Sequence, residues 1–361
     1  MGWGLFISTV CTCAIIFVVL QPIYHHKNAT LVVLSLLLIY LAFSGYNFFY
    51  GDIRGDMMSF AVFGDMLSEH AQRGGLITIT HDIALAQRLG GDIIVMKQGK
   101  VVETGCVEDV LANPQSDYTT ALIESNPQYW PKRTPAQSYN ALISVKDISL
   151  VRNHATLFEG VSFSLKEGEV LGVYGQSGCG KTSLADALLG LLTPSKGKIR
   201  YHQAVGVGQK LKLYQDPPSA FSAHVTLLQL LDDLQSIHPF DSAEVLPLMK
   251  QLKLDTSLLD RTPRQISGGE LQRFAILRAL LMKPKLLIAD EPTSRLDPIA
   301  AAETLQLLTS LATERQCSLM IIGHDQVALE KLCDKVIDLH QYAPTSESCQ
   351  SVNCLVDAQQ I

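Results

Sequence analysis

Hydrophobic residues are concentrated in the first fifty positions of this 361-residue chain. Residues 3–20 and 29–50 contain no charged side chain, and the segment between them carries polar residues that include Lys27. Each apolar stretch is long enough to cross a bilayer as a helix, and the polar segment suits a short turn. The pattern predicts an N-terminal hydrophobic helical hairpin over residues 1–50. A hairpin buried in a globular domain and a fused foreign sequence are the alternatives.

Beyond residue 145, short apolar runs end in glycine-rich or acidic residues. The run over residues 168–175 leads into a helix predicted at 182–192, and the run that starts at Lys285 ends in Asp290 and Glu291. Apolar strands with ligand-binding residues at their carboxyl ends are typical of open α/β sheets. The C-terminal part is therefore predicted to be an α/β domain with a site at the edge of its sheet.

The composition is that of a folded chain without affinity for nucleic acid. Hydrophobic residues make up 47% and charged residues 18%, which excludes wholesale disorder. The formal net charge of -6 provides no basic field for DNA or RNA. The eight cysteines never form a CxxC pair, so neither a zinc site nor a small disulfide scaffold is indicated.

A phosphate-binding loop follows the first of these apolar runs. Residues 175–182 match the pattern GxxxxGK[ST] in full, and a helix is predicted directly after them. Glycines let backbone amides curl around phosphates, Lys181 can reach the β- and γ-phosphates, and the Thr182 hydroxyl can coordinate Mg²⁺. The predicted nucleotide-binding residues of this loop are Gly175, Gln176, Ser177, Gly178, Cys179, Gly180, Lys181, Thr182 and Ser183.

Two further features point to phosphate chemistry. Adjacent acids at a strand end are often merely solvated, but beside a phosphate-binding loop Asp290 is predicted to bind Mg²⁺ and Glu291 to polarise the attacking water. Ser267 and Glu270 have the spacing of a capping box at the start of a helix that runs to Leu281. Its free amides, next to Gly268 and Gly269, form a second anion-binding helix end.

These motifs, in this order and spacing, resemble the nucleotide-binding domain of ABC transporter ATPases over about residues 141–339. Residues 213–217 are similar to the Q-loop, 294–297 to the D-loop and 322–325 to the switch-histidine segment. The resemblance implies a P-loop NTPase domain with an antiparallel β flank and a helical insert at about 218–281. It implies ATP and Mg²⁺ as ligands, Glu291, His324 and Gln215 as catalytic residues, and Thr182, Gln215 and Asp290 as metal ligands.

The resemblance also implies a partner. Two domains of this family stack head to tail, so Ser267, Gly268 and Gly269, with Asp297 of the D-loop, would serve nucleotide across the interface. His324 would contact the γ-phosphate of the nucleotide bound at Lys181. The second ABC ATPase domain would come from another copy of this chain or from a related subunit.

One position departs from the family pattern. The family often stacks the adenine on an aromatic residue, whereas Arg152 occupies that place here. An arginine plane can stack on a base, so Arg152 is predicted to contact the nucleotide and base selectivity is expected to be loose.

The chain contains an incomplete repeat of this domain. Residues 77–82 and 93–96 parallel 320–325 and 336–339 at an offset of 243. The continuation to residue 127 resembles the C-terminal extension of oligopeptide, dipeptide and nickel importers. Residues 65–126 are therefore interpreted as the remnant of a first ABC ATPase domain without its phosphate loop, and its His81 as vestigial. Residues 127–140 are interpreted as a linker, 141–340 as the complete domain and 341–361 as a flexible tail.

The leading interpretation is an ATP-hydrolysing subunit of an ABC importer for peptides or a nickel-type ligand. Its expected partners are transmembrane permease subunits and a solute-binding protein, with the ATPase domain on the cytoplasmic face of the inner membrane. One alternative is a soluble ABC-type ATPase unrelated to transport. The other is a truncated or fused chain that binds ATP without productive transport.

Overall fold

The structure, a computed structural model, describes residues 77–80, 82–135, 140–152, 155–215, 220–294 and 296–344. The hydrophobic hairpin predicted over residues 1–50 lies outside these ranges, as do His81 and all but the first four residues of the predicted tail. In the described ranges, no helix has both the length and the apolar character needed to cross a membrane.

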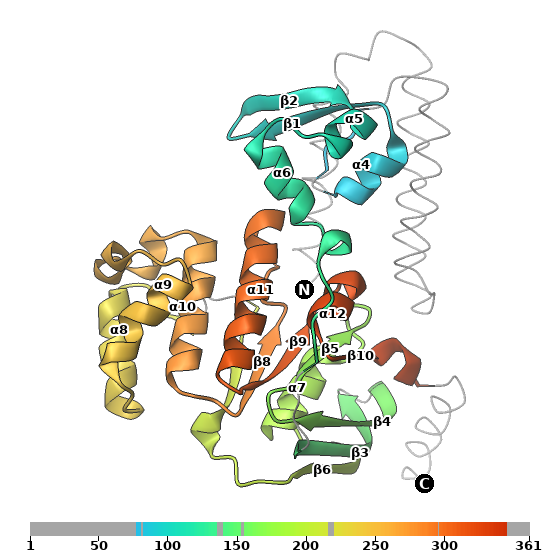
Figure 1. The fold of residues 1–361 in the computed structure, drawn as a ribbon. Helices are drawn as coiled ribbons and strands as arrows, with labels where there is room; N and C mark the ends of the chain where they lie inside the picture. Colours follow the sequence, from blue (N-terminus) through green and yellow to red (C-terminus); the bar gives the residue numbers. More distant parts are fainter. Residues whose placement is uncertain are drawn as a thin grey trace, which may run out of the picture. The chain divides into compact units, whose positions relative to one another are not determined.

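A parallel sheet carries the site of the predicted ATPase domain (Figure 1). Its five strands run in the order β10-β5-β9-β8-β7. Every residue of the strands β8 and β9 is buried, as expected for parallel strands covered on both faces. The strands are β5 (Val170–Tyr174), β7 (Lys210–Leu213), β8 (Leu286–Asp290), β9 (Ser318–Ile322) and β10 (Lys335–Asp338). The predicted strands at 168–175 and 285–290 are confirmed.

Alternate side chains of these strands enter two separate cores, because successive residues of a strand point to opposite faces. Leu287 and Leu319 belong to the core shared with the helical region. Ile288 and Met320, one position further along, belong to the core shared with the antiparallel sheet and α7. The sheet is thus fixed from both sides, which holds its carboxyl edge rigid.

Three helices of the ATPase domain are connected to this sheet: α7 (Lys181–Leu189), α11 (Pro298–Glu314) and α12 (Gln326–Leu332). The helix predicted over 182–192 ends earlier, at Leu189. Gly190 adopts a left-handed conformation with φ of 78°, and its amide bonds back to the carbonyl of Ala187. A glycine in this conformation terminates a helix without steric cost, so the helix stops there.

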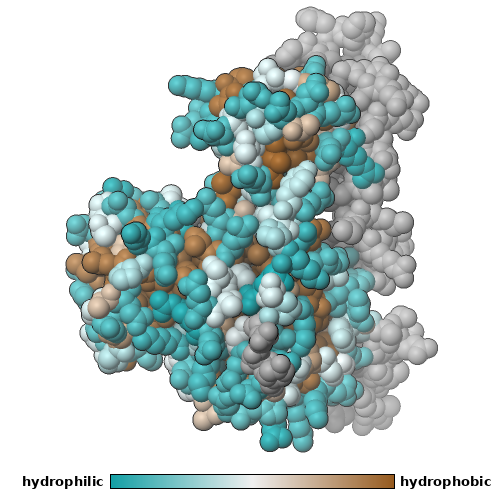
Figure 2. Space-filling view, viewed as in Figure 1, coloured by the Kyte–Doolittle hydropathy of each residue, from teal (hydrophilic) through white to brown (hydrophobic). Residues whose placement is uncertain are grey.

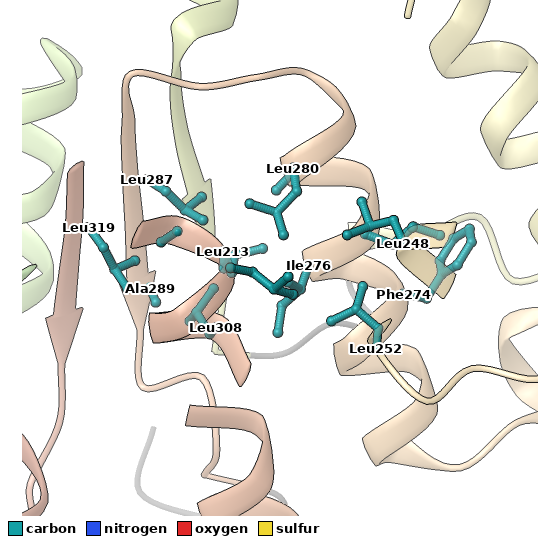
Figure 3. Packing of buried hydrophobic residues seen from close by; sticks show 14 of the residues in the cluster. Leu213, Leu248, Leu252, Phe274, Ile276, Leu280, Leu287, Ala289, Leu308 and Leu319 are labelled. Atoms are coloured by element: carbon teal, nitrogen blue, oxygen red, sulfur yellow. The ribbon is translucent and has the colours of Figure 1, made fainter. Parts of the chain in front are cut away.

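The antiparallel flank and the helical insert are both present. The flank consists of β3 (Ala141–Arg152), β4 (Ala155–Lys166) and β6 (Lys196–Tyr201) in the order β4-β3-β6. The insert contains α8 (Leu227–Ile237), α9 (Val245–Gln251) and α10 (Gly268–Leu281). Phe274 and Ile276 of α10 pack with Leu248 of α9 and Leu287 of the sheet, so the insert shares one core with the sheet (Figure 3). Short 3-10 helices lie at Pro127–Tyr129, Val207–Gln209, Ser242–Glu244, Thr256–Asp260, Pro263–Gln265 and Leu339–Tyr342.

The segment before the ATPase domain repeats the end of that domain in its local structure. It contains α4 (Ile83–Leu89), β1 (Asp92–Lys97), β2 (Lys100–Cys106), α5 (Val107–Ala112) and α6 (Asp117–Glu124). Helices α4 and α12 are displaced by the same offset of 243 residues at both ends. Asp82 and Asp325 cap them alike, each accepting a bond from the backbone amide three residues on.

The two segments differ in the exposure of their equivalent residues. Met320 and Ile322 of β9 are fully buried, whereas Ile77 and Ile79 at the equivalent positions are 85% and 89% exposed. Strand β1 pairs with β2, and its Ile94 and Met96 are exposed. Hydrophobic surface is visible over the part of the molecule that holds β1 and β2 (Figure 2).

Part of the predicted linker packs against α12 and its neighbours. Trp130 is buried in the core of the ATPase domain. The Arg133 side chain pairs with Asp334 at 3.1 Å, and its amide donates to the carbonyl of Lys331. Asp334 also accepts a bond from the amide of Val170 at the start of β5, so these contacts extend to the strand before the phosphate loop.

Candidate functional site

The predicted phosphate-binding loop connects β5 directly to α7, in the order that phosphate binding requires. Gly178 and Gly180 have φ values of 86° and 101°, in the left-handed region that favours glycine. A Cβ at Gly180 would lie 3.0 Å from the Phe158 ring and 3.1 Å from Leu157. Gly180 is the N-cap residue of α7, and no side chain caps the helix there. The loop and the helix end therefore offer their backbone amides.

Lys181 is held inside this loop. Its Nζ donates to the carbonyl oxygens of Gly175 at 2.6 Å and Gln176 at 3.0 Å. The side chain is buried, and these two contacts replace the hydration that burial removes. Cys179 is half-buried, and burial raises the pKa of its thiol. The thiol therefore stays neutral near pH 7. Cys179 occupies one of the x positions of the motif, where no particular side chain is required.

A cleft of about 490 Å³ brings together all three predicted catalytic residues. This volume lies in the range of small-molecule sites. The described residues that line it come from the loop, the strand ends and the antiparallel flank: Arg152, Leu157, Ser177, Gly178, Gly180, Lys181, Thr182, Ser183, Gln215, Glu291 and His324.

Glu291 is clamped between the other two predicted catalytic side chains. Its Oε2 accepts a bond from Gln215 Nε2 at 2.7 Å, and its Oε1 lies 2.6 Å from His324 Nε2. The backbone at Glu291 has φ of 48°, a left-handed conformation that is uncommon outside glycine. Its amide donates to the carbonyl of Ile322 at 3.0 Å. The carboxylate is thus fixed at the mouth of the cleft, at the junction of β8 and β9.

Asp290 has a different partner. Its Oδ2 lies 3.1 Å from Nζ of Lys212 on β7, which also pairs with Asp186 of α7 at 2.9 Å. Burial acts to lower the pKa of Lys212, but the hydrogen bond to Asp186 and the charge of Asp290 outweigh it and raise that pKa. The ammonium is therefore charged. The sequence motifs gave no sign of this contact, because Lys212 lies outside each of them.

The donor set fits Mg²⁺ chemistry only in combination with phosphate oxygens. Among the described residues, no group of three or more His, Cys, Asp or Glu side chains could hold a metal by itself. Thr182 supplies a hydroxyl and Gln215 an amide oxygen at the cleft, and Asp290 supplies a carboxylate next to it. Hard oxygen donors in small number, completed by substrate phosphates, are what Mg²⁺ uses in nucleotide sites.

The antiparallel flank supplies two cleft residues. Arg152, predicted from the sequence to contact the base, lines the cleft and reaches Ser183 Oγ at 3.5 Å. Leu157 of β4 also lines it, and sequence reasoning did not identify this residue. No motif marks Leu157, since its place at the cleft depends on the pairing of β3 with β4.

The Ser-Gly-Gly helix end is not part of the described lining of this cleft. Ser267 caps α10, and the capping box with Glu270 is confirmed. Bonds from the hydroxyl and amide of Ser267 hold the pKa of Glu270 below its usual value. Asp297 caps α11 by accepting a bond from the amide of Ala300. None of Ser267, Gly268, Gly269 and Asp297 belongs to the described lining of the Lys181 cleft.

Comparison with known proteins finds similar sequences for this domain. A family model described as ABC transporter matches residues 158–294. An uncharacterised ABC transporter ATP-binding protein of Escherichia coli K12, YejF, is 32% identical over 295 residues, which is 74% of this chain and 55% of that protein. The oligopeptide transport ATP-binding protein OppF of Salmonella typhimurium is 34% identical over 199 residues, 50% of this chain and 60% of that protein. The chain thus spans a little more than half the length of these relatives.

A solved structure supports the fold. A protein proposed to be an ABC transporter ATP-binding protein of Pyrococcus furiosus superposes with a TM-score of 0.50, at 19% identity, over 56% of this chain and 99% of that one. The family match covers the strand that ends in Asp290, the phosphate loop and the Ser-Gly-Gly helix. Residues 158–294 therefore match the ABC transporter family model, and the chain is similar to ATP-binding proteins of ABC transporters.

Proposed function

We propose that this chain binds ATP with Mg²⁺ in the Lys181 cleft and hydrolyses it to drive an ABC transporter. ABC ATPases as a family couple ATP hydrolysis to transport. The observation that carries the proposal is the convergence of Lys181, Thr182, Gln215, Glu291 and His324 on one cleft from four separate stretches of sequence. Such convergence is what in-line phosphoryl transfer needs, because its catalysis depends on positioning and charge.

The proposed mechanism uses the groups as the structure arranges them. Lys181 and the loop amides bind the β- and γ-phosphates. Glu291, oriented by Gln215 and His324, aligns a water with the γ-phosphorus and draws off its proton. Thr182, Gln215 and Asp290 would hold Mg²⁺, and the bound ion would neutralise the charge that develops on the phosphate oxygens.

The test separates binding from hydrolysis. In the full-length chain, Glu291→Gln removes the base but keeps an acceptor, so turnover should fall about a hundredfold or more while ATP binding persists. Lys181→Ala should lose both binding and turnover. Glu303→Gln, a surface acid of α11 that pairs with Lys253, is the matched control and should leave both unchanged. Full turnover in Lys181→Ala would refute the proposal.

We further propose that a second ABC ATPase domain completes the site. Support comes from the absence of the Ser267 helix end from the described lining of the Lys181 cleft, because a second domain in trans can bring such a helix end to the γ-phosphate. Glu291→Gln should therefore trap an ATP-dependent dimer on size exclusion. A wild-type monomer that hydrolyses saturating ATP would contradict the proposal.

The transport direction and solute class are proposed from the relatives. The name of OppF connects it with oligopeptide transport, which supports a peptide-like solute. A glutathione import ATP-binding protein of Escherichia coli K12, GsiA, is 29% identical over 314 residues, which supports import. A nickel-type ligand remains the finer proposal from the sequence resemblance. Permease subunits at the inner membrane and a solute-binding protein would be the partners, with this domain on the cytoplasmic side. Stimulation of its ATPase by a reconstituted permease tests the assignment, and indifference to the permease would favour a soluble ATPase.

We propose that residues 65–126 derive from a first ABC ATPase domain. The matched offsets of α4 and α12 support this origin. The alignment with YejF supports it too, because that alignment covers 74% of the chain, which is more than residues 141–340 alone make up. Ile77 and Ile79 are exposed where Met320 and Ile322 are buried, which fits a copy without the strand that β5 supplies in the second domain. The hydrophobic hairpin of residues 1–50 stays a sequence-based proposal, and protease protection in membrane vesicles would test it.

A further inference from the structure

Lys212 forms an ion triad with Asp290 and Asp186 at the edge of the site. Strand β7 pairs in parallel with β8, and this register sets Lys212 opposite Ile288, two residues before Asp290. From there its Nζ reaches Asp290 Oδ2 at 3.1 Å and Asp186 Oδ1 at 2.9 Å. The Lys212 and Asp290 side chains are 6% and 8% exposed, so solvent screens this contact weakly.

The triad joins three elements that all carry parts of the site. Asp186 lies on α7, which begins at Lys181, and Asp290 ends the strand that precedes Glu291. Asp290 is a predicted Mg²⁺ ligand that does not belong to the described lining of the cleft. One of its oxygens is engaged by a fixed cation, and a second carboxylate, Asp186, competes for the same ammonium.

We propose that Lys212 is a positioning residue that lowers the affinity of Asp290 for a free divalent cation, and that Asp186 moderates it. The inference rests on the proposed function in taking Asp290 as the metal carboxylate. A bound ammonium and a metal ion compete for the same carboxylate charge, so the metal binds well only when ATP phosphates add their own oxygens. Metal entry is thereby coupled to nucleotide entry.

The proposal predicts opposite effects for two substitutions. Lys212→Met removes the competing cation and leaves Asp290 near a second carboxylate, so affinity for a divalent ion should rise by about tenfold. Asp186→Asn leaves the ammonium to Asp290 alone, so that affinity should fall by about threefold. A triad that served the fold alone would give losses of stability in both variants and no opposed change in metal affinity.

The experiment is a Mn²⁺ titration of the full-length chain without nucleotide, with free Mn²⁺ followed by electron paramagnetic resonance. Lys212→Arg keeps the cation and should retain wild-type affinity. Lys210→Met is the matched control, because Lys210 lies on the same strand but stacks on Tyr201 instead of pairing with Asp290. Melting temperatures of all variants show whether each is folded. If Lys212→Met did not fold, the Mn²⁺ affinity of Asp186→Asn would still test the proposal.

Three outcomes are separable. Opposed shifts in Lys212→Met and Asp186→Asn, with Lys210→Met unchanged, support the inference. Changes of the same sign in the Mn²⁺ affinity of these two variants, or no change in either, overturn the inference. ATP affinity of the wild-type chain, measured with Mg²⁺ and with EDTA, reports independently on the proposed function. If Mg²⁺ left ATP binding unchanged, the proposed function would fail, whatever the Mn²⁺ titration shows.

Discussion

Gly180 is the position at which the phosphate loop has the least room. Its φ of 101° is a conformation that costs a residue with a side chain about 1–2 kcal/mol. A methyl group there would also meet the Phe158 ring at 3.0 Å and Leu157 at 3.1 Å. Phe158 is fully buried and cannot move freely, so the added contact should cost a further 1–3 kcal/mol or so.

Gly178 provides a matched comparison within the same loop. Its φ of 86° carries the same backbone cost, but nothing lies within 4 Å of a Cβ built there. Gly178→Ala should therefore lose about 1–2 kcal/mol, and Gly180→Ala about 2–5 kcal/mol. Because Leu157 lines the cleft, its displacement in Gly180→Ala should also weaken ATP binding more than Gly178→Ala does.

The assay is urea unfolding of the two variants and the wild type, combined with a fluorescent-nucleotide titration. The difference between the two alanine variants isolates the steric contact, since the backbone cost is common to both. Equal unfolding free energies for Gly178→Ala and Gly180→Ala would refute the reasoning, because they would mean that Phe158 and Leu157 yield without cost.

Three other predictions address the insert, the capping box and the base contact. Phe274→Ala should cost about 3–5 kcal/mol in urea unfolding, because this ring is fully buried; a loss below about 1 kcal/mol would contradict that packing. The lowered pKa of Glu270 means that its bonds with Ser267 add stability above the ordinary carboxyl pKa and lose it as the pH falls through the folded value. The melting-temperature difference between wild type and Glu270→Gln should therefore shrink on acidification, and a constant difference would argue against the bonded carboxylate. Arg152→Ala should weaken ATP and GTP binding alike by about tenfold if its plane stacks on the base; an unchanged affinity would remove Arg152 from the site.

The parts of the site that the sequence predicted are those fixed by local spacing. The phosphate loop, the strand ending in Asp290 and the Ser267 capping box each lie within a few consecutive residues, so their order along the chain determines their geometry. The family resemblance implied Gln215, Glu291 and His324 as catalytic residues, and in the structure Glu291 contacts the other two side chains.

What the sequence missed depends on contacts between distant segments. Lys212 reaches Asp290 through the register of β7 against β8, and Asp186 through the packing of α7 against the sheet. Neither relation has a spacing rule in the chain. The early end of α7 had a local signal, Gly190, which the helical pattern beyond it obscured.

The charged groups of the site share one property that bears on how it responds to ATP. Lys181 is held by its own loop carbonyls, Glu291 by Gln215 and His324, and Asp290 by Lys212. Phosphate binding must therefore exchange existing contacts, and the measured affinity is the difference between two sets of bonds. It follows that a substitution in this cleft can tighten ATP binding while it slows hydrolysis. Loss of Glu291 as a partner frees both Gln215 and His324 for the γ-phosphate. Loss of Lys181 removes its bonds to the loop carbonyls together with its contact to phosphate, and it frees no other group to bind the phosphate.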